Sequence, residues 1–509
     1  AESGGHATST TSKIPKSLEG WSDNSVTLST QYLFSKGNAE YTFPTKVLGP
    51  YSSQSHTFDT LQIPSLVDQF IGNTSDGDNN KFQGGRNVML FAYGQTGSGK
   101  THTMLGTDES LDFTQTQNDD YHHRNESPKF HPGWGIFPRV YVSALEKLKQ
   151  RQQQQHQHHS YNMLSASAIQ FYLGETQDIL EPSSQVKIDP DTHEVLGAAM
   201  WDMNSIQDLI QFLNAVRTNR QTRSTKMNEG SSRSHAALIL YLRRYYNGIP
   251  NTDSKGNGTS SRKTTCATND RSNEGLYCQT TFTIMDLAGA ERPTKTGETR
   301  FTSAEMILWE MSRGGETTEV PTGAQAYIVN WELSGLATEI ARATEFHRRQ
   351  RQQRSKDGQT RNAPPLKYQP PKQLATDAIR FLSTCFSGKA ITSLCLCLSP
   401  ANVNGWETWF SLQWGQSVSK LNIPVEKQYA INFEKAYTKA KKEAIKAKVE
   451  LDKSEEKQKQ MSSSSKRWNN HNKYYEVRKF RLQLATTKME DFEKMARVFS
   501  SPVKLNVSA

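Results

Sequence analysis

The residues best suited to chemistry lie in one short stretch, Gly94-Gln95-Thr96-Gly97-Ser98-Gly99-Lys100-Thr101. It fits the phosphate-loop pattern G-x-x-x-x-G-K-[ST] at every defining position. Glycines lack a Cβ, so the backbone can turn its amides inward and let phosphate oxygens approach closely. Lys100 would neutralise the β- and γ-phosphates of a nucleotide, and the Thr101 hydroxyl would be a ligand of Mg²⁺. The pattern therefore predicts a nucleotide-binding loop, with a helix beginning near Lys100.

The elements around this loop are those that a nucleotide site needs. An apolar run at 88–93 comes directly before the loop and predicts a buried strand. Further along, candidate strands separated by helical stretches predict an α/β sheet with helices on both faces. A late strand is expected at 390–398, where Cys395 and Cys397 lie two positions apart on one face. We interpret these thiols as packing residues, because Cys-x-Cys alone is at best half of a metal site.

Two further motifs stand next to predicted strands. One is Asn228-Glu229-Gly230-Ser231-Ser232-Arg233-Ser234-His235, a cluster of short hydroxyls around one Arg. The other is Asp286-Leu287-Ala288-Gly289-Ala290-Glu291, directly after an apolar run at 277–285. An Asp at a strand end can hold the hydration shell of Mg²⁺, and a Gly amide a few residues later can donate to a γ-phosphate. Both motifs are therefore candidates for the same nucleotide site.

With these three motifs in this order, the chain resembles a kinesin motor domain. The phosphate loop with its trailing Thr-His-Thr-Met, the first switch N-x-x-S-S-R-S-H and the second switch D-L-A-G-x-E are similar to the kinesin patterns at every defining position. Weaker similarity extends over about residues 46–424. The resemblance implies a P-loop NTPase of kinesin type, with a central, mostly parallel β-sheet, helices on both faces and additional C-terminal helices. It also implies an enzyme that hydrolyses ATP with Mg²⁺ and works on microtubules.

The resemblance assigns roles residue by residue. Arg233 and Glu291 would form a salt bridge between the two switches, although a surface ion pair of small value is the plain alternative. Thr101 and Ser232 would be Mg²⁺ ligands, with Asp286 acting through water. The residues expected to take part in catalysis are Lys100, Ser231, Ser232, Arg233, Gly289 and Glu291. The residues expected to bind nucleotide are Gly94, Gln95, Thr96, Gly97, Ser98, Gly99, Lys100, Thr101 and His102.

The charge of the chain agrees with an acidic partner. Lys and Arg number 61 against 51 Asp and Glu, a net charge of +10. A basic cluster falls where kinesins carry a tubulin-binding loop, so the residues expected at the microtubule are Arg348, Arg349, Arg351, Arg354, Lys356 and Lys372. A solvated charged loop is the alternative for this cluster. Nucleic acid also fits the charge, but the sequence has no recognised base-reading module, so we do not expect it as a partner.

The chain departs from kinesins in the segment that packs on adenine and in the region that would face the microtubule. Residues 1–50 contain no Arg-x-Arg-Pro, the segment that packs on adenine in kinesins. Trp331-Glu332 replaces Lys-Ser in the helix after the second switch, and the region before this helix is longer than usual. A second hypothesis is therefore a non-motile, kinesin-fold scaffold on microtubules, with weak or no ATP turnover.

Composition suggests how the chain is divided. We expect a disordered segment at 1–24, a motor-like domain at 25–424, and a neck-linker-like segment with charged helices at 425–509. Insertions into the motor-like domain are expected near 107–132, 150–159, 247–275, 298–326 and 346–364. An apolar, aromatic face of the last helix should pack on the motor or on a partner helix or cargo. Five cysteines and no early apolar run favour reduced thiols in the cytoplasm, and no stretch of about 20 apolar residues is present to span a membrane. The kinesin resemblance implies a place on the cytoskeleton.

Overall fold

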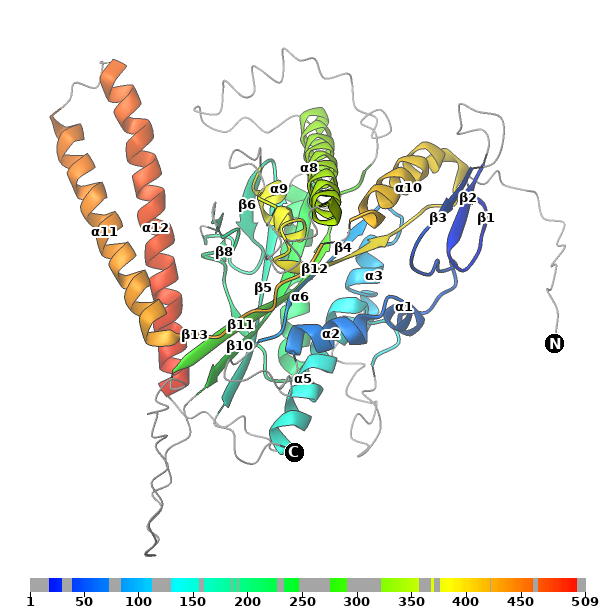
Figure 1. Cartoon of the computed structure of the whole chain (residues 1–509), viewed down its shortest axis with the longest axis horizontal. Helices are drawn as coiled ribbons and strands as arrows, with labels where there is room; N and C mark the ends of the chain where they lie inside the picture. The colour runs from blue at the N-terminus through cyan, green and yellow to red at the C-terminus, as the bar shows by residue number, and fades with distance from the viewer. Residues whose placement is uncertain are drawn as a thin grey trace, which may run out of the picture.

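A mixed β-sheet with helices on both faces forms the body of the protein in its computed structural model (Figure 1). The structure describes residues 18–29, 39–72, 84–111, 130–154, 160–184, 186–189, 192–226, 233–246, 275–290, 322–356, 368–369, 376–421, 423–460 and 466–500. The strands of the sheet are β4 (Asn87–Tyr93), β5 (Ser160–Tyr172), β6 (Glu175–Asp178), β9 (Trp201–Asp202), β10 (His235–Tyr246), β11 (Leu276–Asp286), β12 (Ala390–Leu396) and β13 (Ile431–Asn432). The expected α/β fold is confirmed.

The strand order places β4 between two parallel neighbours. The order is β12-β4-β11-β10-β5-β6, with β13 paired to β11 and β9 paired to β5. Pairing is parallel from β12 through β4 to β11 and antiparallel in the other pairs, so the parallel strands expected from the sequence are those beside the phosphate loop. Asp286 is in register with Ala92, and Leu396 with Tyr93. The carboxyl ends of three strands therefore meet at one edge, the usual place for a ligand in such a sheet.

Strand β4 is buried on both faces because helices cover each side. Its residues alternate, so Val88, Leu90 and Ala92 point into one core and Met89, Phe91 and Tyr93 into the other. The first core is shared with α1 (Gln54–Thr60), α2 (Ile63–Ile71), α3 (Lys100–Met104), α5 (Ile136–Gln154) and α6 (Ile206–Lys226). The second is shared with α8 (Thr322–Lys356), α9 (Asp377–Leu382) and α10 (Gly405–Ser419).

Smaller elements surround the body. A three-stranded sheet joins β1 (Leu18–Trp21), β2 (Ser25–Leu28) and β3 (Ala39–Thr42), and a two-stranded one joins β7 (Lys187–Ile188) and β8 (Val195–Leu196). Short 3₁₀ turns are η2 (Glu109–Leu111), η6 (Ser383–Cys385) and η7 (Asn402–Asn404). The expected disorder over 1–24 is thus wrong for 18–21, because these residues pair with β2.

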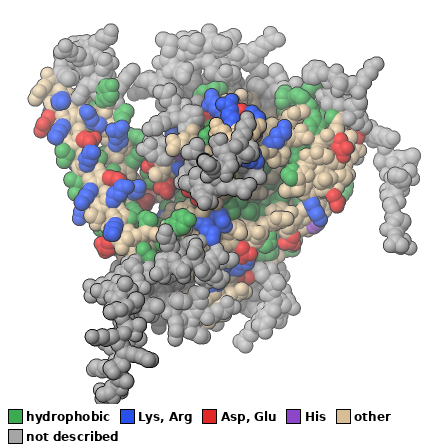
Figure 2. All heavy atoms as spheres, viewed as in Figure 1, with side chains coloured by type: hydrophobic (Ala, Val, Ile, Leu, Met, Phe, Trp, Pro, Cys, Tyr) green, Lys and Arg blue, Asp and Glu red, His purple; other side chains and the backbone are tan. Residues whose placement is uncertain are grey.

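The chain ends in an antiparallel hairpin of α11 (Phe433–Lys459) and α12 (Lys466–Ser500), which extends from one side of the sheet (Figure 1). Figure 2 shows Lys and Arg side chains spread over this hairpin. Its base packs on the sheet: Phe433 and Phe492 both contact Tyr277 of β11, with ring centroids 5.8 and 6.2 Å away. Helix α12 therefore packs on both the body and a partner helix of the same chain. In the described part of the chain, every helix is too short or too polar to cross a bilayer.

Candidate active site

The phosphate loop begins where β4 ends and closes at the first turn of α3, which starts at Lys100 as predicted. Gly94, Gly97 and Gly99 have φ values of 153°, 77° and 95°. Such values are costly for residues with a Cβ, which explains Gly at these positions. At Gly94 space matters as well, because an added Cβ would lie 2.1 Å from the carbonyl oxygen of Cys397. The loop is shaped by backbone conformation at all three glycines and by close packing at one.

Lys100 is buried inside the loop that precedes it. Its Nζ donates to the carbonyl oxygens of Gly94 and Gln95, at 2.9 and 2.8 Å. Ser98 Oγ also donates to the Gln95 carbonyl, at 2.8 Å, which tightens the turn. A buried ammonium at a glycine-rich turn where a helix begins is a binding point for a phosphate anion.

Thr101 and Asp286 meet at the edge where β4 and β11 end. Thr101 Oγ1 donates to Asp286 Oδ2 at 2.5 Å, and Arg220 Nη1 from α6 lies 3.8 Å from the same carboxylate oxygen. Asp286 is buried, and its Oδ1 has no hydrogen-bond partner among the described residues. A buried carboxylate oxygen without a donor is costly unless a further group completes it.

These two side chains fit Mg²⁺. The ion prefers hard oxygen ligands and usually binds proteins through one or two of them, keeping waters and phosphates for the rest. The Thr101 hydroxyl, the Asp286 carboxylate and the unpartnered Asp286 Oδ1 supply oxygens of this kind. Within the described residues no cluster of three or more His, Cys, Asp or Glu competes as a metal site.

Two residues at the site were missed by the sequence analysis. Gln54 of α1 donates from Nε2 to the carbonyl oxygen of His102, at 2.7 Å, and so braces the helix that follows the loop. Arg220 balances the Asp286 charge. No local pattern marks either residue, because each reaches the site from a separate helix far away in the chain. His102 itself is exposed beside the loop.

The first switch enters the site through residues that precede or begin β10. Arg233 is buried, and so is His235, whose Nδ1 accepts from the Ala288 backbone N–H at 2.9 Å. His235 Nε2 lies 3.3 Å from Glu332 Oε2 on α8, and Glu332 is also buried. His235 therefore joins the first switch, the second switch and α8. Ser231 and Ser232 lie outside the described residues.

The second switch begins beside the phosphate loop. The Leu287 N–H donates to the Ala92 carbonyl and the Ala290 N–H to the Gly94 carbonyl, each at 3.3 Å. Gly289 lies buried between them, next to the loop. Glu291 lies outside the described residues. Of the two residues in the expected salt bridge, the structure therefore describes only Arg233.

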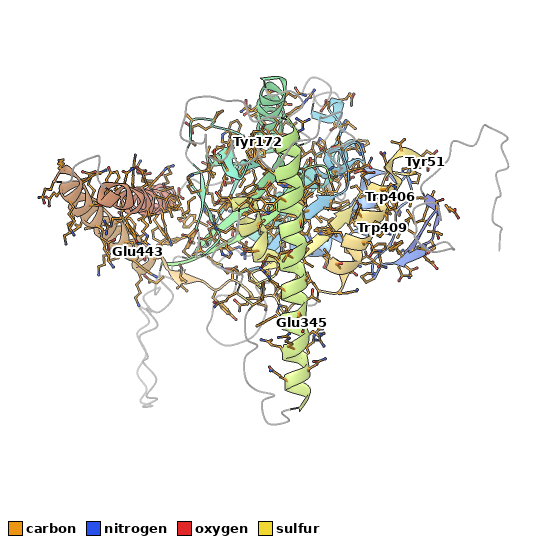
Figure 3. All side chains as sticks on the ribbon, turned by 90° about the horizontal axis from the view of Figure 1, so that it is seen from above. Tyr51, Tyr172, Glu345, Trp406, Trp409 and Glu443 are labelled. Atoms are coloured by element: carbon orange, nitrogen blue, oxygen red, sulfur yellow. The ribbon has the colours of Figure 1, made fainter. Side chains whose placement is uncertain are left out.

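The basic cluster is in a helix, which corrects the expected loop. Helix α8 runs to Lys356, so Arg348, Arg349 and Arg351 lie in its last turns, where it projects past the body near Glu345 (Figure 3). Glu345 accepts from Arg348 Nε at 2.7 Å and from Arg349 Nε at 2.6 Å, and these bonds lower the pKa of Glu345 to about 2. These pairs at i,i+3 and i,i+4 add modestly to the stability of the helical conformation. The helix also includes Arg354 and Lys356, while Lys372 lies outside the described residues.

Comparison with known proteins agrees with this geometry. The sequence profile of the kinesin motor domain family matches residues 36–308. The chain is 26% identical over 390 residues to kinesin-like protein KIN-UA of Oryza sativa subsp. japonica, covering 75% of this chain and 33% of that protein. It is 24% identical over 417 residues to the kinesin heavy chain of Doryteuthis pealeii, covering 81% of this chain and 32% of the relative. The chain thus spans about a third of the length of these relatives.

A solved structure of a fast kinesin has the same fold. The two superpose with a TM-score of 0.52 at 19% identity, over 82% of this chain and 88% of that chain. The profile match covers more than half of the chain. Among the described residues, His235 of the first switch contacts Ala288 of the second, and Ala290 of the second switch contacts Gly94 of the phosphate loop. The chain belongs to the kinesin motor domain family.

Proposed function

We propose that this chain is a microtubule-binding ATPase that couples hydrolysis of Mg·ATP to changes in its affinity for the microtubule. The observation that carries the proposal is the contact between Thr101 and Asp286 at the mouth of an intact phosphate loop. We assign the motor-like unit to residues 25–424 and the appended linker and helices to 425–509. A place on the cytoskeleton in the cytoplasm follows from this function.

The residues divide the work of phosphoryl transfer. Lys100 and the loop amides would bind the β- and γ-phosphates, and Thr101, Ser232 and Asp286 would hold Mg²⁺. When bound, Mg²⁺ neutralises charge that develops on the phosphates. Gly289 would sense the γ-phosphate through its amide. Phosphoryl transfer depends on positioning of the reactants and on charge stabilisation more than on covalent bonds formed by the protein.

The two switches would complete the site. Ser231 and Ser232 would close over the γ-phosphate, and the Arg233–Glu291 bridge would order the attacking water. Loss of the γ-phosphate would release these segments, as in other switch proteins. His235 offers a route onward, because it contacts the second switch at Ala288 and helix α8 at Glu332. Movement of α8 would then alter binding to tubulin through the charged end of the helix.

A non-motile scaffold on microtubules is the second candidate, and it is favoured by Trp331-Glu332 on α8, where kinesins have Lys-Ser. Arg348 and Arg349 share the Glu345 carboxylate, so less of their charge is available to an acidic track. Such exposed pairs are weak in water and open readily, so they reduce binding to tubulin without preventing it.

The substitution Glu291→Ala separates the two candidates. If the switch bridge orders the attacking water, phosphate release should fall by about a hundredfold, the usual loss when a positioning group is removed from such a site. Equilibrium binding of a fluorescent ADP should stay near the wild-type value, because Glu291 does not contact the diphosphate in this assignment. Microtubule-stimulated phosphate release that survives Glu291→Ala would contradict the bridge. Wild-type protein that binds microtubules without turnover would support the scaffold.

A further inference from the structure

Two thiols lie together directly behind the phosphate loop. Cys395 is in β12 and Cys397 follows the strand, so both side chains lie on the same face, against the first core. Their sulfur atoms are 3.9 Å apart. Cys397 is 9% exposed, and Cys395 is more open because β12 is the edge strand of the sheet. Of the two thiols, Cys395 is the more exposed to solvent.

The backbone of Cys397 supports the first glycine of the loop. Its N–H donates to the Tyr93 carbonyl at 2.8 Å, directly before Gly94. Its own carbonyl oxygen occupies the space that a Cβ on Gly94 would need, 2.1 Å from that position. A displacement of Cys397 would therefore remove the hydrogen bond and the packing that support the backbone at Tyr93 and Gly94, where the Gly94 carbonyl also accepts from Lys100.

The two thiols differ in acidity. A hydrogen bond from Cys395 lowers the pKa of Cys397, and the Lys100 charge acts in the same direction. The same contact raises the pKa of Cys395, and burial adds to the rise. Cys397 is therefore the more acidic of the two thiols, which suits it to attack and Cys395 to resolve.

The other described cysteines lack this arrangement. Cys278 packs at Gly84, and Cys385 donates to the sulfur of Met89 at 3.0 Å. Burial raises the pKa of Cys278 to about 11 and that of Cys385 to about 12. Both stay protonated at neutral pH, so they serve as internal controls.

We propose that Cys395 and Cys397 form a thiol modification site, which a hydroperoxide converts to a disulfide that disturbs the phosphate loop. The Cys397 sulfur attacks one oxygen of hydrogen peroxide, the O–O bond breaks, and the other oxygen leaves as water after taking a proton. Cys397 is then a sulfenic acid. The Cys395 sulfur attacks it, the S–S bond forms, the S–O bond breaks, and hydroxide takes the thiol proton to leave as a second water. Two electrons pass from the thiols to the peroxide.

The disulfide would change the backbone conformation at the carboxyl end of β12. Alternate residues of a strand are about 6.6 Å apart at the Cα atoms, near the upper limit for a disulfide. The bond must therefore draw Cys397 toward Cys395 and away from Tyr93 and Gly94. We expect weaker nucleotide binding in the oxidised protein, a consequence that rests on the proposed function, whereas disulfide formation does not.

Peptide mass analysis tests the modification. Trypsin cleaves after Lys389 and Lys420, so both thiols fall in one peptide, 390–420. After treatment of the full chain with hydrogen peroxide, removal of the peroxide with catalase and alkylation, this peptide should have lost two hydrogens and taken up no alkyl group. The peptides that carry Cys278 and Cys385 should be fully alkylated. Retention of two alkylatable thiols in 390–420, or oxidation of Cys397 to a sulfinic acid without a disulfide, would overturn the proposal.

Nucleotide affinity tests the consequence. Oxidised wild-type protein should bind a fluorescent ADP about tenfold more weakly than reduced protein, and dithiothreitol should restore the affinity. Reduced Cys395→Ser should bind like reduced wild type, and peroxide treatment should leave its affinity unchanged. Equal affinity of the oxidised and reduced wild type would contradict the link to the loop. If even the reduced protein fails to bind nucleotide, the proposed function fails, while the mass of peptide 390–420 still decides the disulfide.

Discussion

Thr101 and Asp286 lie 185 positions apart in the chain, yet their side-chain oxygens are 2.5 Å apart. Two parallel strands, β4 and β11, bring them together because both end at the same edge of the sheet. Asp286 Oδ1 has no partner within the described residues, and Arg220 lies 3.8 Å from Oδ2. The site is therefore arranged to receive a cation and phosphates together, since each supplies charge that the other needs.

Asp286→Asn should separate charge from shape at this position. Asn can still accept from Thr101 but carries no negative charge to hold hydrated Mg²⁺. We expect Mg·nucleotide affinity to fall about ten- to a hundredfold, with the magnesium titration shifted to higher concentration, because a charge-assisted contact contributes about 1.5–3 kcal/mol. Asp108→Asn is the matched control, since Asp108 pairs with Arg217 on the surface at 3.3 Å. Equal effects of the two substitutions would refute the assigned role of Asp286.

Sequence patterns predicted the residues of the candidate site but not the side chains from other helices that contact them. The loop and the Asp at the end of β11 follow from short patterns whose chemistry is local, and Lys100 begins α3 as expected. Gln54 and Arg220 could not be predicted, because only the packing of α1 and α6 brings them to the site. Glu332 departs from the kinesin pattern, which has Ser at this position, but its contact with His235 depends on where α8 crosses the sheet.

Helix α8 is the element that the sequence described least well. Its basic end reads as a charged loop, since polar residues without apolar periodicity predict no packing face. The helix nevertheless continues to Lys356, supported by pairs such as Arg348–Glu345 and Arg349–Glu345. Its body carries Leu333, Leu336 and Ile340 into the second core. Packing at one end and charge pairing at the other together keep one long helix.

The His235–Glu332 contact fixes α8 to both switches. His235 Nδ1 accepts from the Ala288 N–H, which leaves Nε2, 3.3 Å from Glu332 Oε2, as the nitrogen that carries a proton. Glu332→Ala should lower the free energy of unfolding by about 1.5–3 kcal/mol, the usual contribution of a hydrogen bond to a charged group. Glu332→Gln, which keeps an acceptor oxygen, should lose less.

Urea unfolding measures both Glu332 variants, with Glu345→Ala as the control on the exposed end of α8, where little change is expected. The assignment would be wrong if Glu332→Gln were as unstable as Glu332→Ala. It would also be wrong if Glu332→Ala were as stable as the wild type.

The C-terminal hairpin depends on one aromatic cluster at its base. Phe433 contacts Tyr245, Tyr277 and Phe492, with ring centroids 5.9, 5.8 and 5.5 Å away. Phe433→Ala should destabilise the docked hairpin by about 3–5 kcal/mol, because a buried ring is replaced by a cavity. Hydrogen exchange should then quicken in β13, α11 and α12 while β4 and β10 stay protected. Tyr474→Ala, at a side chain that is 67% exposed, should leave exchange unchanged; slow exchange in the Phe433→Ala hairpin would show that other contacts hold it.

At the scale of the whole molecule, the site, α8 and the hairpin share one sheet. The nucleotide edge lies at the carboxyl ends of β4 and β11, while the hairpin packs near the opposite end of β11 through β13 and Tyr277. Helix α8 covers the second face and connects to the switches through Glu332. In the proposed function, a change at the nucleotide would reach α8 through the His235–Glu332 contact, and the hairpin through strand β11.

The central claim is tested most directly by steady-state phosphate release with Mg·ATP, with and without polymerised tubulin, at low and moderate salt. We predict slow release alone and strong stimulation by microtubules, weakened by salt because the track contacts are charged. Lys100→Ala should remove release under all conditions. Salt-sensitive binding to microtubules without any stimulation, or release that persists in Lys100→Ala, would contradict a microtubule-activated ATPase at this site.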